Sequence, residues 1–440
     1  MNNIRSSQHP DSPLTRRSFL GNTAAAVAGS ALIAGAPSIG RAQSAKTLSI
    51  ALVGCGGRGS GAAKQALSAD SNIVLTAMAD IAPDQIEKSL ENLKGQFSSE
   101  PEKIKVEDSR KFVGLDAIDK VLASDVDVVL LTTPPGFRPE HFEKSVKAGK
   151  HAFCEKPIAT DAPGVRRFLE AAKMSKEKGL GCQSGFCWRS HYPHRETYER
   201  IHNGMIGDVR AVYGTYLTNT PWVKPRQPGW TDLEYQLRNW MYFCWLSGDH
   251  LVEQAVHTVD KMCWTFKDVD PISATGQGGR QQRVEDQYGH IYDHFTIQYE
   301  FPNNARAFIF CRQQQGCSND VSDHVLGTKG FLRQTSGRLN MIEAGNDRWK
   351  YEGPKNDMYQ TEHDEFFSSL REGKPLNYAE KLAHSTMVAI MGRMSAYTGQ
   401  TITWEDAVNS KEDLRPKEKL DWNMKLETPP VPIPGRTKFV

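Results

Sequence analysis

Apolar runs typical of buried strands alternate with segments of helical spacing over the first half of the chain. The strand-like runs lie at 48–54, 73–80, 127–133 and 151–155. The helical patterns lie at 60–67, 141–148 and 164–178. Strands separated by such helices pair in parallel through right-handed crossovers, with helices on both faces of the sheet. The pattern therefore predicts a Rossmann-type, doubly wound α/β domain over residues 46–186.

The second half of the chain alternates with period two. Strand-like runs at 209–217, 291–301 and 305–313 are separated by polar turns. This pattern predicts an α+β domain for substrate binding and oligomerisation over 187–427, built around a large, mostly antiparallel sheet. Two domains also fit the length, because the nearly 400 residues after position 45 exceed what one hydrophobic core usually serves. The proline-rich residues 428–440 are expected to form an extended arm over a neighbour or over the sheet.

The first 45 residues have the composition of an export signal. Arg16 and Arg17 form an arginine pair, small apolar residues fill 24–36, and small residues near Ala42 suit cleavage. The apolar run is far shorter than the roughly 20 residues that span a bilayer, so no stable membrane insertion is expected. We interpret residues 1–45 as a twin-arginine signal, which implies the twin-arginine export machinery as a partner and a periplasmic or other extracytoplasmic location. The alternative is a disordered tail with a chance arginine pair.

Charge and cysteine content narrow the classes of partner. The formal net charge is +2 with no block of like charges, so neither nucleic acid nor an anionic membrane is expected as a partner. The eight cysteines include no Cys-x-x-Cys pair, and several lie in apolar runs, so we expect mostly free, buried thiols. An oxidising compartment permits disulfides, and Cys311 with Cys317 is the first pair to check. From the balanced charge we expect a small soluble substrate rather than a nucleic acid or a membrane.

A glycine-rich turn follows the first predicted strand and opens the first predicted helix. Its residues are Gly54, Gly56, Gly57, Arg58 and Gly59, in the spacing Gly-x-Gly-x-x-Gly. Asp80 lies 21 residues further on, where a carboxylate accepts hydrogen bonds from ribose hydroxyls. The unit predicts a dinucleotide with its pyrophosphate at the helix N-terminus, and Asp80 favours NAD over NADP because it would repel a 2′-phosphate. Arg58 softens this preference if it reaches a phosphate. The alternative is a glycine-rich turn without a ligand.

Two motifs after position 127 are those of one known family. Residues 128–135 read Val-Val-Leu-Leu-Thr-Thr-Pro-Pro, and the triplet Glu155-Lys156-Pro157 ends a later strand. The chain resembles the glucose-fructose oxidoreductase and inositol dehydrogenase family, often called Gfo/Idh/MocA. The resemblance implies that Lys156 lies beside the nicotinamide and the reacting carbinol. It also implies that the cofactor site includes Thr133, Pro134, His141 and Glu155.

Lys156 has a chemical rationale of its own. The carboxyl ends of parallel strands form the ligand-binding edge of a doubly wound sheet. A lysine at that edge can donate to a developing alkoxide, or lose its own proton when it is desolvated. The alternative is that Glu155 and Lys156 form a solvated charge pair.

The second domain carries further family features. The segment 188–193, Trp-Arg-Ser-His-Tyr-Pro, resembles the family's entry into the substrate domain and makes Arg189 a candidate substrate residue. In this family the open face of the large sheet commonly packs against a second subunit. The resemblance therefore implies a homo-oligomer, either a dimer or a tetramer.

A third group of candidates lies at 247–260. By resemblance, His257 takes the family's catalytic acid/base position, and Glu253 stands where the family usually has Asp. A spacing of four residues predicts that Glu253 and His257 share one helix face, with His250 on the same side. His257 can exchange a proton with a substrate hydroxyl near neutral pH, while the longer Glu253 positions the substrate or acts as a second acid/base. The alternatives are a surface pair, or a divalent ion held by all three side chains. The family does not generally need a metal, and none is expected.

Aromatic and amide side chains precede this group and are typical of carbohydrate sites. The cluster comprises Trp230, Arg238, Asn239, Trp240, Tyr242, Phe243 and Trp245. Flat aromatic faces suit sugar C–H surfaces, and Arg and Asn bind hydroxyls. We expect Arg238, Asn239 and Trp240 to contact the substrate together with His250 and Glu253. The alternative is a tryptophan-rich core beneath the sheet.

The expected function is an exported NAD-dependent oxidoreductase that acts on a sugar, glycoside or cyclitol by hydride transfer. Lys156 and His257 would handle the proton of the oxidised hydroxyl. Free NAD is not expected to be maintained outside the cytoplasm, so the cofactor would be held tightly and recycled in one site. An alternative with the same recycling is an NAD-dependent glycosidase that works by oxidation, elimination, hydration and reduction. A second alternative is a non-catalytic sugar-binding protein, against which the presence of Lys156 and His257 counts.

Overall fold

The computed structural model describes residues 46–335 and 338–440, of which Thr47–Val440 form one compact unit. The predicted export signal, with Arg16 and Arg17, lies outside the described residues. Of the helices within the described ranges, none combines the length and the apolar character that a membrane span requires.

The first part of this unit is a six-stranded parallel sheet in the order β3-β2-β1-β4-β5-β6. The strands are β1 (Leu48–Val53), β2 (Ile73–Asp80), β3 (Lys111–Val113), β4 (Val128–Leu131), β5 (His151–Cys154) and β6 (Cys182–Ser184). The chain leaves β1 towards β2 on one side and later returns to β4 on the other. Ligands bind at the carboxyl ends of strands where the order reverses in this way, and here that point lies between β1 and β4.

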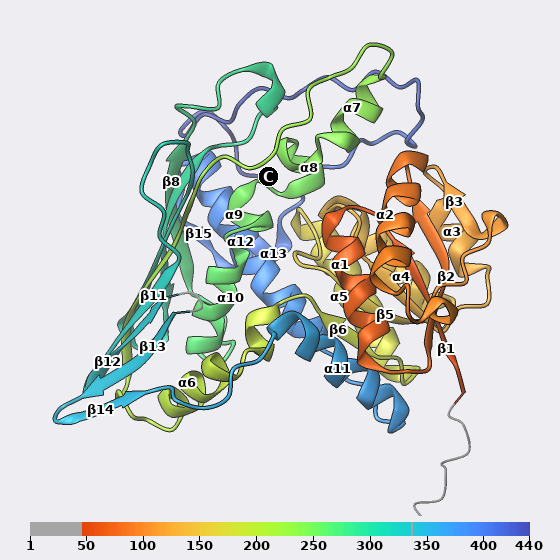
Figure 1. Cartoon of the computed structure of the whole chain (residues 1–440). Helices are drawn as coiled ribbons and strands as arrows, with labels where there is room; N and C mark the ends of the chain where they lie inside the picture. The colour runs from red at the N-terminus through yellow and green to blue at the C-terminus, as the bar shows by residue number, and fades with distance from the viewer. Residues whose placement is uncertain (1–45, 336–337) are drawn as a thin grey trace, which may run out of the picture. The chain divides into compact units, whose positions relative to one another are not determined.

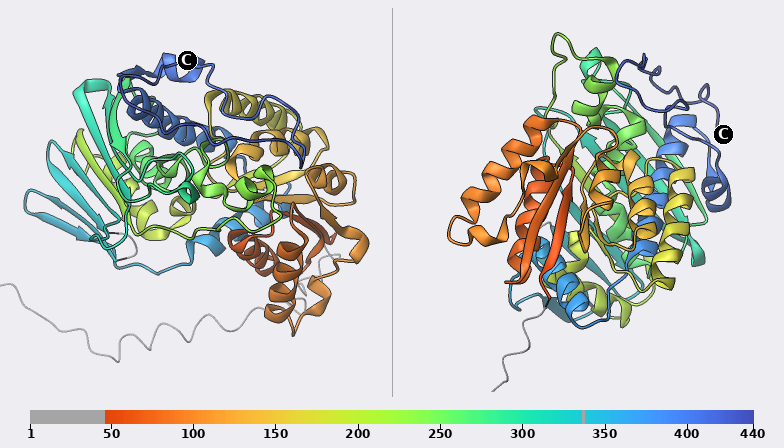
Figure 2. Two further views of the ribbon diagram at one scale, coloured as in Figure 1. Left: turned by 90° about the horizontal axis from the view of Figure 1, so that it is seen from above. Right: turned by 90° about the vertical axis from the view of Figure 1, so that its right-hand side faces the viewer.

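Helices cover both faces of the parallel sheet (Figure 2, right). They are α1 (Gly57–Ala69), α2 (Pro83–Gln96), α3 (Ala117–Leu122), α4 (Arg138–Lys147) and α5 (Ala162–Glu177). On one face, α1 and α2 bury Leu67 and Leu90 against Leu52 of β1 and Leu130 of β4. On the other face, α4 and α5 join a core that continues into the rest of the molecule. The predicted Rossmann-type architecture is confirmed.

The second part is a nine-stranded sheet in the order β14-β13-β12-β11-β7-β10-β9-β8-β15. Its strands are β7 (Val209–Thr218), β8 (Ser273–Gly279), β9 (His294–Phe301), β10 (Ala305–Gln313), β11 (Ser322–Gly327), β12 (Gly330–Thr335), β13 (Leu339–Ala344), β14 (Asp347–Lys350) and β15 (Ile402–Thr403). All neighbours pair antiparallel except β7 with β10. The prediction of a large, mostly antiparallel sheet is confirmed.

Helices pack against one face of this sheet, with α10 and α12 beside it in Figure 1. The helices of this part are α6 (Tyr192–His202), α7 (Asp232–Arg238), α8 (Cys244–Ser247), α9 (His250–Glu253), α10 (Val256–Thr265), α11 (Met358–Arg371), α12 (Ala379–Thr398) and α13 (Trp404–Asn409). Gly214 of β7 allows a close approach, because a Cβ there would lie 2.3 Å from the Thr258 methyl group of α10. The opposite face carries Tyr213 and Leu326, which are 38% and 42% exposed.

The segment after α13 packs against other parts of the same chain. The Pro432 carbonyl accepts a hydrogen bond from the Tyr292 hydroxyl (2.9 Å), and the Gly435 N–H donates to the Thr398 carbonyl (2.8 Å). Arg415 reaches Glu140 of α4 at 3.1 Å. The proline-rich residues therefore lie against α12 and the start of β9 of the same chain.

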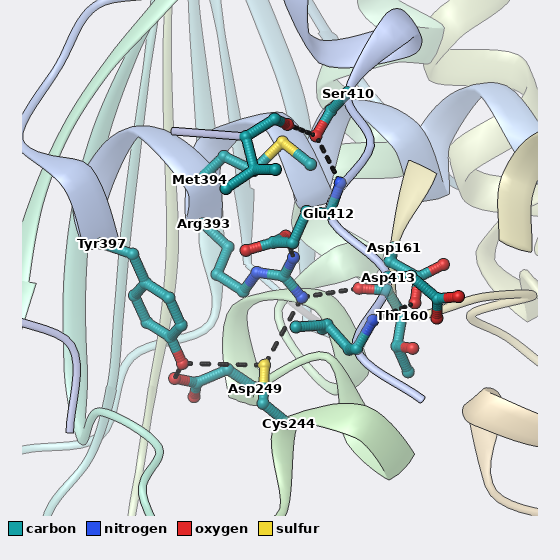
Figure 3. A network of polar contacts seen from close by, with 12 residues as sticks. Thr160, Asp161, Cys244, Asp249, Arg393, Met394, Tyr397, Ser410, Glu412 and Asp413 are labelled. Atoms are coloured by element: carbon teal, nitrogen blue, oxygen red, sulfur yellow. Dashed lines mark hydrogen bonds and ion pairs between the residues drawn. The ribbon is translucent and has the colours of Figure 1, made fainter. Parts of the chain in front are cut away.

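A buried arginine anchors the start of this segment (Figure 3). Arg393 of α12 is fully buried and pairs with Glu412 at 2.5 Å. Its guanidinium also donates to the Thr160 carbonyl (2.6 Å) and contacts the Cys244 sulfur (3.5 Å). One side chain thus connects α12, α8, the chain after β5 and the segment after α13. All eight cysteines are free thiols, and seven of them, Cys311 included, are buried.

Candidate active site

The glycine-rich turn joins β1 to α1 at the centre of the parallel sheet. Gly54 has a φ of +98°, a conformation that favours glycine. A Cβ at Gly59 would lie 2.0 Å from the Gly54 carbonyl oxygen, so α1 approaches the turn with no room for a side chain. Gly56 and Gly57 face open space, because a Cβ at either would meet no atom within 4 Å. The N-terminus of α1 is therefore uncovered, as the binding of a pyrophosphate requires.

Asp80 ends β2 beside this turn. One of its carboxylate oxygens accepts a hydrogen bond from the Cys55 backbone N–H (2.7 Å), and the other accepts one from the Ala82 N–H (3.1 Å). Burial raises the pKa of Asp80 above its ordinary value. The carboxylate is held at the edge of the turn, where Rossmann folds bind a ribose. The turn and Asp80 therefore fit NAD.

Arg58 does not extend towards the open side of the turn. Its Nε forms a close ion pair with Glu155, its Nη1 donates to the Gln65 side-chain oxygen (2.9 Å), and its guanidinium lies 4.9 Å from the centre of the Tyr359 ring. Burial opposes the ionisation of Glu155, but the charge of Arg58 prevails and lowers the pKa of Glu155. In this structure Arg58 thus connects the glycine turn to the Glu155-Lys156-Pro157 triplet.

Glu362 of α11 is a buried carboxylate beside this pair that the sequence did not reveal. It is 1% exposed, and neither of its carboxylate oxygens has a hydrogen-bond partner. Arg58 Nη2 lies 3.6 Å away. Burial, with repulsion from Glu155, raises the pKa of Glu362 well above its ordinary value. His363, the next residue, stacks on Phe153 of β5 with ring centres 4.3 Å apart.

Lys156 meets Glu253 at the carboxyl end of β5. Lys156 Nζ donates to the Glu253 carboxylate at 3.2 Å and to the Glu253 backbone carbonyl at 2.5 Å. Each side chain is 13% exposed, so the pair is shielded but accessible. Residues 97 positions apart are thereby joined at the ligand-binding edge of the parallel sheet.

The expected continuous helix through Glu253 and His257 is interrupted. Helix α9 ends at Glu253 and α10 begins at Val256, and Gln254 with Ala255 forms the break. The Ala255 N–H bonds to the His250 carbonyl (2.9 Å), five residues back rather than four. The expectation that a spacing of four places Glu253 and His257 on one regular helix face is therefore wrong.

His257 nevertheless lies near Lys156. Burial lowers the pKa of His257 well below its ordinary value, and the positive charge of Lys156 lowers it further. Its Nδ1 is buried without a hydrogen-bond partner, and its ring lies at 76° to the Phe186 ring, with ring centres 6.1 Å apart. The imidazole is therefore neutral at pH 7 and is able to accept a proton.

His250 is not brought together with Glu253 and His257. It is 1% exposed and packs on Phe295 of the large sheet, with ring centres 5.0 Å apart. Its pKa is lowered well below the ordinary value by burial and by the charge of Arg283. Within 46–335 and 338–440, no group of three His, Cys, Asp or Glu side chains is arranged to hold a metal ion.

The remaining cofactor candidates lie just after β4. The Thr133 hydroxyl and His141 Nδ1 are 3.2 Å apart, and Pro134 caps the turn between them. Burial lowers the pKa of His141 to about 4, so its ring is neutral. These residues lie at the same sheet edge as the glycine turn, since the Thr132 hydroxyl donates to the Gly54 carbonyl (2.6 Å).

The predicted substrate residues Arg189, Arg238, Asn239 and Trp240 have partners within the protein. Arg189 pairs with the buried Asp260 (2.8 Å) and with Asp268 (2.5 Å). Arg238 pairs with Glu234 (2.9 Å) and with Asp84 of α2 (3.1 Å). Asn239 is fully buried and donates to the Gln287 carbonyl (2.7 Å), while Trp240 packs edge-on to Trp222. The structure does not gather these four side chains with Lys156.

Sequence analysis missed three residues around the Lys156–Glu253 pair. Tyr216 of β7 lies near Glu253, and burial with this negative charge raises the pKa of Tyr216 to about 12. Arg138 Nη1 donates to the Pro157 carbonyl, and burial lowers the pKa of Arg138 to about 10. Gln254 occupies the helix break and accepts from Gln313 (2.6 Å). Alternation along β7 could have revealed Tyr216, because it shares a face with Val212 and Gly214.

Both parts of the chain are similar to proteins of one known family. The model described as the oxidoreductase family with an NAD-binding Rossmann fold (GFO_IDH_MocA) matches residues 48–185, and the GFO/IDH/MocA C-terminal domain matches 194–333. Inositol 2-dehydrogenase of Rhizobium meliloti is 25% identical over 325 residues, which are 73% of this chain and 86% of that protein. Inositol 2-dehydrogenase 3 of Saccharopolyspora erythraea is 28% identical over 233 residues, which are 52% of this chain and only 61% of that protein.

The fold also has solved counterparts. The structure of aldose-aldose oxidoreductase from Caulobacter crescentus, complexed with glycerol, superposes with a TM-score of 0.65 at 19% identity. The superposition covers 81% of this chain and all of that one. At this identity the likeness concerns the fold.

Both family models describe the same family, and together they match more than half of the chain. Several relatives, the two inositol 2-dehydrogenases among them, are oxidoreductases that act on CH–OH groups, and the matched first domain is an NAD-binding one. The predictions of an oxidoreductase and of NAD as its cofactor are confirmed. With its glycine turn, its Glu155-Lys156-Pro157 triplet and its two sheets, this chain belongs to the GFO/IDH/MocA family of NAD-binding oxidoreductases.

Proposed function

We propose that this protein oxidises a CH–OH group of a sugar, glycoside or cyclitol with NAD as the hydride acceptor. The observation that carries this proposal is the contact of Lys156 with Glu253, near a neutral His257, at the sheet edge that holds the glycine turn. A carbinol oxygen bound there would lie between a cationic donor and a neutral base. This is the arrangement that removal of a hydride from carbon requires, because the hydroxyl proton must leave as well.

Each residue has a defined part in the proposed reaction. Bound NAD supplies the hydride acceptor. Lys156 Nζ donates to the carbinol oxygen and stabilises the charge that develops on it. His257, which is neutral, accepts the hydroxyl proton. Glu253 holds Lys156 in position through two contacts and lies where a neighbouring substrate hydroxyl would bind.

We further infer that the protein is exported with NAD already bound and keeps it through many turnovers. Arg16 and Arg17 support export by the twin-arginine route, which carries folded proteins to an extracytoplasmic compartment. A retained cofactor needs a second substrate to reoxidise it, and the name of the Caulobacter relative, aldose-aldose oxidoreductase, is consistent with paired sugars. One sugar would be oxidised and a second carbonyl compound reduced in the same site.

A second candidate function is redox-neutral cleavage of a glycosidic bond. Oxidation of a glycoside carbon acidifies the neighbouring C–H, so elimination needs a base in addition to His257. Glu253 and Tyr216 are two further titratable groups near that position. The net reaction would consume water and return the cofactor to its starting state.

The amount of NAD bound to the purified protein tests whether the cofactor is retained. The full chain is produced in a host with twin-arginine export, purified from the periplasm and denatured, and the released nucleotide is quantified by chromatography. We expect about one NAD per chain. Nucleotide-free protein that still folds and binds added NAD weakly would contradict retention and leave the oxidoreductase assignment intact.

Turnover without added nucleotide separates the two candidate functions. Aryl glycosides and free sugars are supplied in turn, and aryl alcohol release and changes in 340 nm absorbance are recorded. An oxidoreductase should form NADH when a free sugar is supplied, and a second carbonyl compound should then reoxidise this NADH. Aryl alcohol release without net NADH would favour the glycosidase.

We also infer that the protein forms a homo-oligomer through the outer face of the nine-stranded sheet. Tyr213 stacks on Phe308 of the neighbouring strand with ring centres 5.1 Å apart, and Leu326 lies on the next strand on the other side. The exposed apolar side chains of Tyr213 and Leu326, on two neighbouring strands, favour burial against a second copy.

A further inference from the structure

A second polar pocket lies near the candidate active site. It is lined by Thr220, Gln282, Arg283, Tyr288 and Gln315, and its volume is about 520 Å³. This volume falls in the range of small-molecule sites. Four of the five side chains end in a hydroxyl or an amide, groups that bind the hydroxyls of a sugar.

Two glutamines connect this pocket to the reacting centre. Arg283 Nη1 donates to the Gln313 side-chain oxygen (2.5 Å), and Gln313 Nε2 donates to the Gln254 side-chain oxygen (2.6 Å). Gln254 directly follows Glu253, at the break between α9 and α10. Two glutamine side chains therefore link the pocket wall to the residue that follows Glu253.

Arg283 is a buried cation without a carboxylate partner. It is 1% exposed, its Nη atoms donate to Gln313 and to the Tyr292 carbonyl, and its Nε has no hydrogen-bond partner. Among the residues that the structure describes, no carboxylate lies within ion-pairing distance of this guanidinium. A buried charge without a counter-charge is costly, and such groups are normally paired.

Two carboxylates near Arg283, those of Asp293 and Asp249, are engaged by other groups. Asp293 accepts from the backbone N–H groups of Gln281 and Gln282 (both 2.7 Å) and, at 3.2 Å, from that of Arg283 itself. Its other oxygen accepts from His294 and Gln314. Asp249 accepts from the Tyr397 hydroxyl (2.5 Å) and from the Tyr292 N–H (2.8 Å). Arg280 lies close enough to Arg283 for the two charges to repel.

The surrounding structure fixes Arg283 in place. The Asp293 carboxylate accepts hydrogen bonds from the backbone N–H groups of residues 281–283. The Arg283 guanidinium lies 5.5 Å from the centre of the Tyr242 ring. Tyr242 also packs edge-on to Tyr288 of the pocket, with ring centres 5.4 Å apart. A side chain held this firmly loses little conformational entropy when a ligand binds beside it.

We propose that this pocket binds the carboxylate of an acidic sugar, such as a uronic acid or its glycoside, while a neighbouring carbinol lies at Lys156. The inference rests on the proposed function, because it identifies the substrate class of that same site. The carboxylate would pair with the charge of the Arg283 guanidinium, and the hydroxyls and amides of Thr220, Gln282 and Gln315 would bind adjacent sugar hydroxyls. One unpaired guanidinium matches a charge of −1, whereas a phosphate would bring nearly two negative charges.

The test compares an acid with its neutral counterpart on the unmodified protein. Methyl glucuronide, its methyl ester, methyl glucoside and glucose 6-phosphate are titrated by calorimetry into the full chain loaded with NAD. We expect the acid to bind at least about tenfold more tightly than its ester, a difference in keeping with a charge-assisted hydrogen bond. Equal affinities of acid and ester would overturn the proposal. Tighter binding of the phosphate would overturn the assignment of a carboxylate.

Three variants locate the effect. Arg283→Gln should reduce the acid-to-ester affinity ratio to about one, and Arg283→Lys should preserve part of it because the charge remains. Gln315→Ala at the exposed rim, which tests the pocket if the arginine variants fold poorly, should weaken the acid and the ester by equal factors. An unchanged ratio in folded Arg283→Gln would place the carboxylate elsewhere and contradict the proposal.

Binding and turnover distinguish this inference from the proposed function. If neutral sugars reduce the cofactor in a Lys156-dependent reaction while acid and ester bind alike, the substrate class is wrong and the oxidoreductase stands. If the acid binds through Arg283 but no sugar is oxidised, the pocket stands and the proposed reaction fails.

Discussion

At the scale of single residues, the Lys156–Glu253 pair combines chemistry with accessibility. Both side chains are mostly buried, yet both keep some contact with solvent. Lys156 is bound by one carbonyl and one carboxylate oxygen, which leaves it one further N–H to donate. A substrate hydroxyl is the natural acceptor for that remaining donor.

Removal of the Lys156 ammonium should abolish most of the activity. Lys156→Met keeps the length and most of the packing of the side chain but cannot donate, so we expect kcat to fall roughly 100- to 10,000-fold, the usual contribution of a positioned proton donor. NAD content should be unchanged, because the glycine turn is unaffected. Steady-state kinetics and nucleotide analysis measure both quantities.

Lys173→Met is the matched control, since Lys173 is an exposed residue of α5. It should retain full activity. Equal turnover by Lys156→Met and the control would show that Lys156 has no part in proton transfer.

The pH profile should reflect the neutrality of His257. Burial and the charge of Lys156 lower its pKa below the ordinary value of 6.5, so the ring stays unprotonated as the pH falls through 6.5 and protonates only at lower pH. If His257 is the proton acceptor, the acid limb of kcat/KM lies below pH 6.5. An acid limb at or above pH 6.5 that disappears in His257→Asn would contradict this prediction.

At the scale of elements, the turn between β1 and α1 carries two kinds of glycine. Gly59 is required by the fold, because a Cβ there would lie 2.0 Å from a backbone oxygen. Gly56 has open space around it, so the fold itself does not require glycine there. A glycine that packing does not require, such as Gly56, points to a ligand, because the lack of a side chain lets a pyrophosphate approach the backbone closely.

A pair of alanine variants separates these roles. Gly59→Ala should lower the free energy of unfolding by roughly 1–3 kcal/mol, as overpacking does. Gly56→Ala should unfold like the unmodified protein but lose NAD affinity, because its methyl group occupies the space of the cofactor. Urea unfolding and NAD titration measure the two effects. Unimpaired NAD binding by Gly56→Ala would place the dinucleotide away from this turn.

Regular periodicity explains which elements are predictable. The strands β1, β2, β4 and β5 are buried on both faces, so each is a continuous apolar run. Strand β3 has three residues, none of them buried, and carries no such signal. The break at Gln254 is equally invisible, because the residues on both sides of it keep helical spacing. At this break the Gln254 side chain accepts a hydrogen bond from Gln313 of β10, a tertiary contact that helical spacing does not reveal.

At the scale of the whole molecule, the segment after α13 helps to join the two sheets. Glu412 neutralises the fully buried Arg393, which in turn binds the chain after β5. Leu414 N–H donates to Asp161 at the start of α5 (3.0 Å). These contacts connect the parallel-sheet part to α12 of the second part.

Loss of the Glu412 charge should therefore destabilise the molecule. Glu412→Gln leaves Arg393 buried without a counter-charge, and we expect a loss of about 3 kcal/mol in the free energy of unfolding, the lower end of the range for a broken buried pair. Glu418→Gln, at an exposed position of the same segment, should change stability by less than about 0.5 kcal/mol. Denaturation curves that coincide for the two variants would mean that Arg393 finds another partner.

The outer sheet face should mediate self-association. Tyr213→Lys combined with Leu326→Lys places two charges on this face and should shift the protein to monomers, because charges are costly at the centre of an interface. Val113→Lys on β3 changes an equally exposed apolar residue of the parallel sheet and should have no such effect. Light scattering over a range of concentrations gives the mass. An unmodified protein that is monomeric at all concentrations would refute the oligomer.

Local patterns in the chain are enough to establish the family, the order of strands and helices, the glycine turn and the importance of Lys156. These features depend on periodicity and on short motifs, which any contiguous stretch of residues displays. Which polar side chains meet is decided by packing alone, because the partners are far apart in the sequence. Arg58 with Glu155, Arg189 with Asp260 and the buried Glu362 are of this kind. So is Arg283, whose missing carboxylate becomes apparent only when all its neighbours are in place.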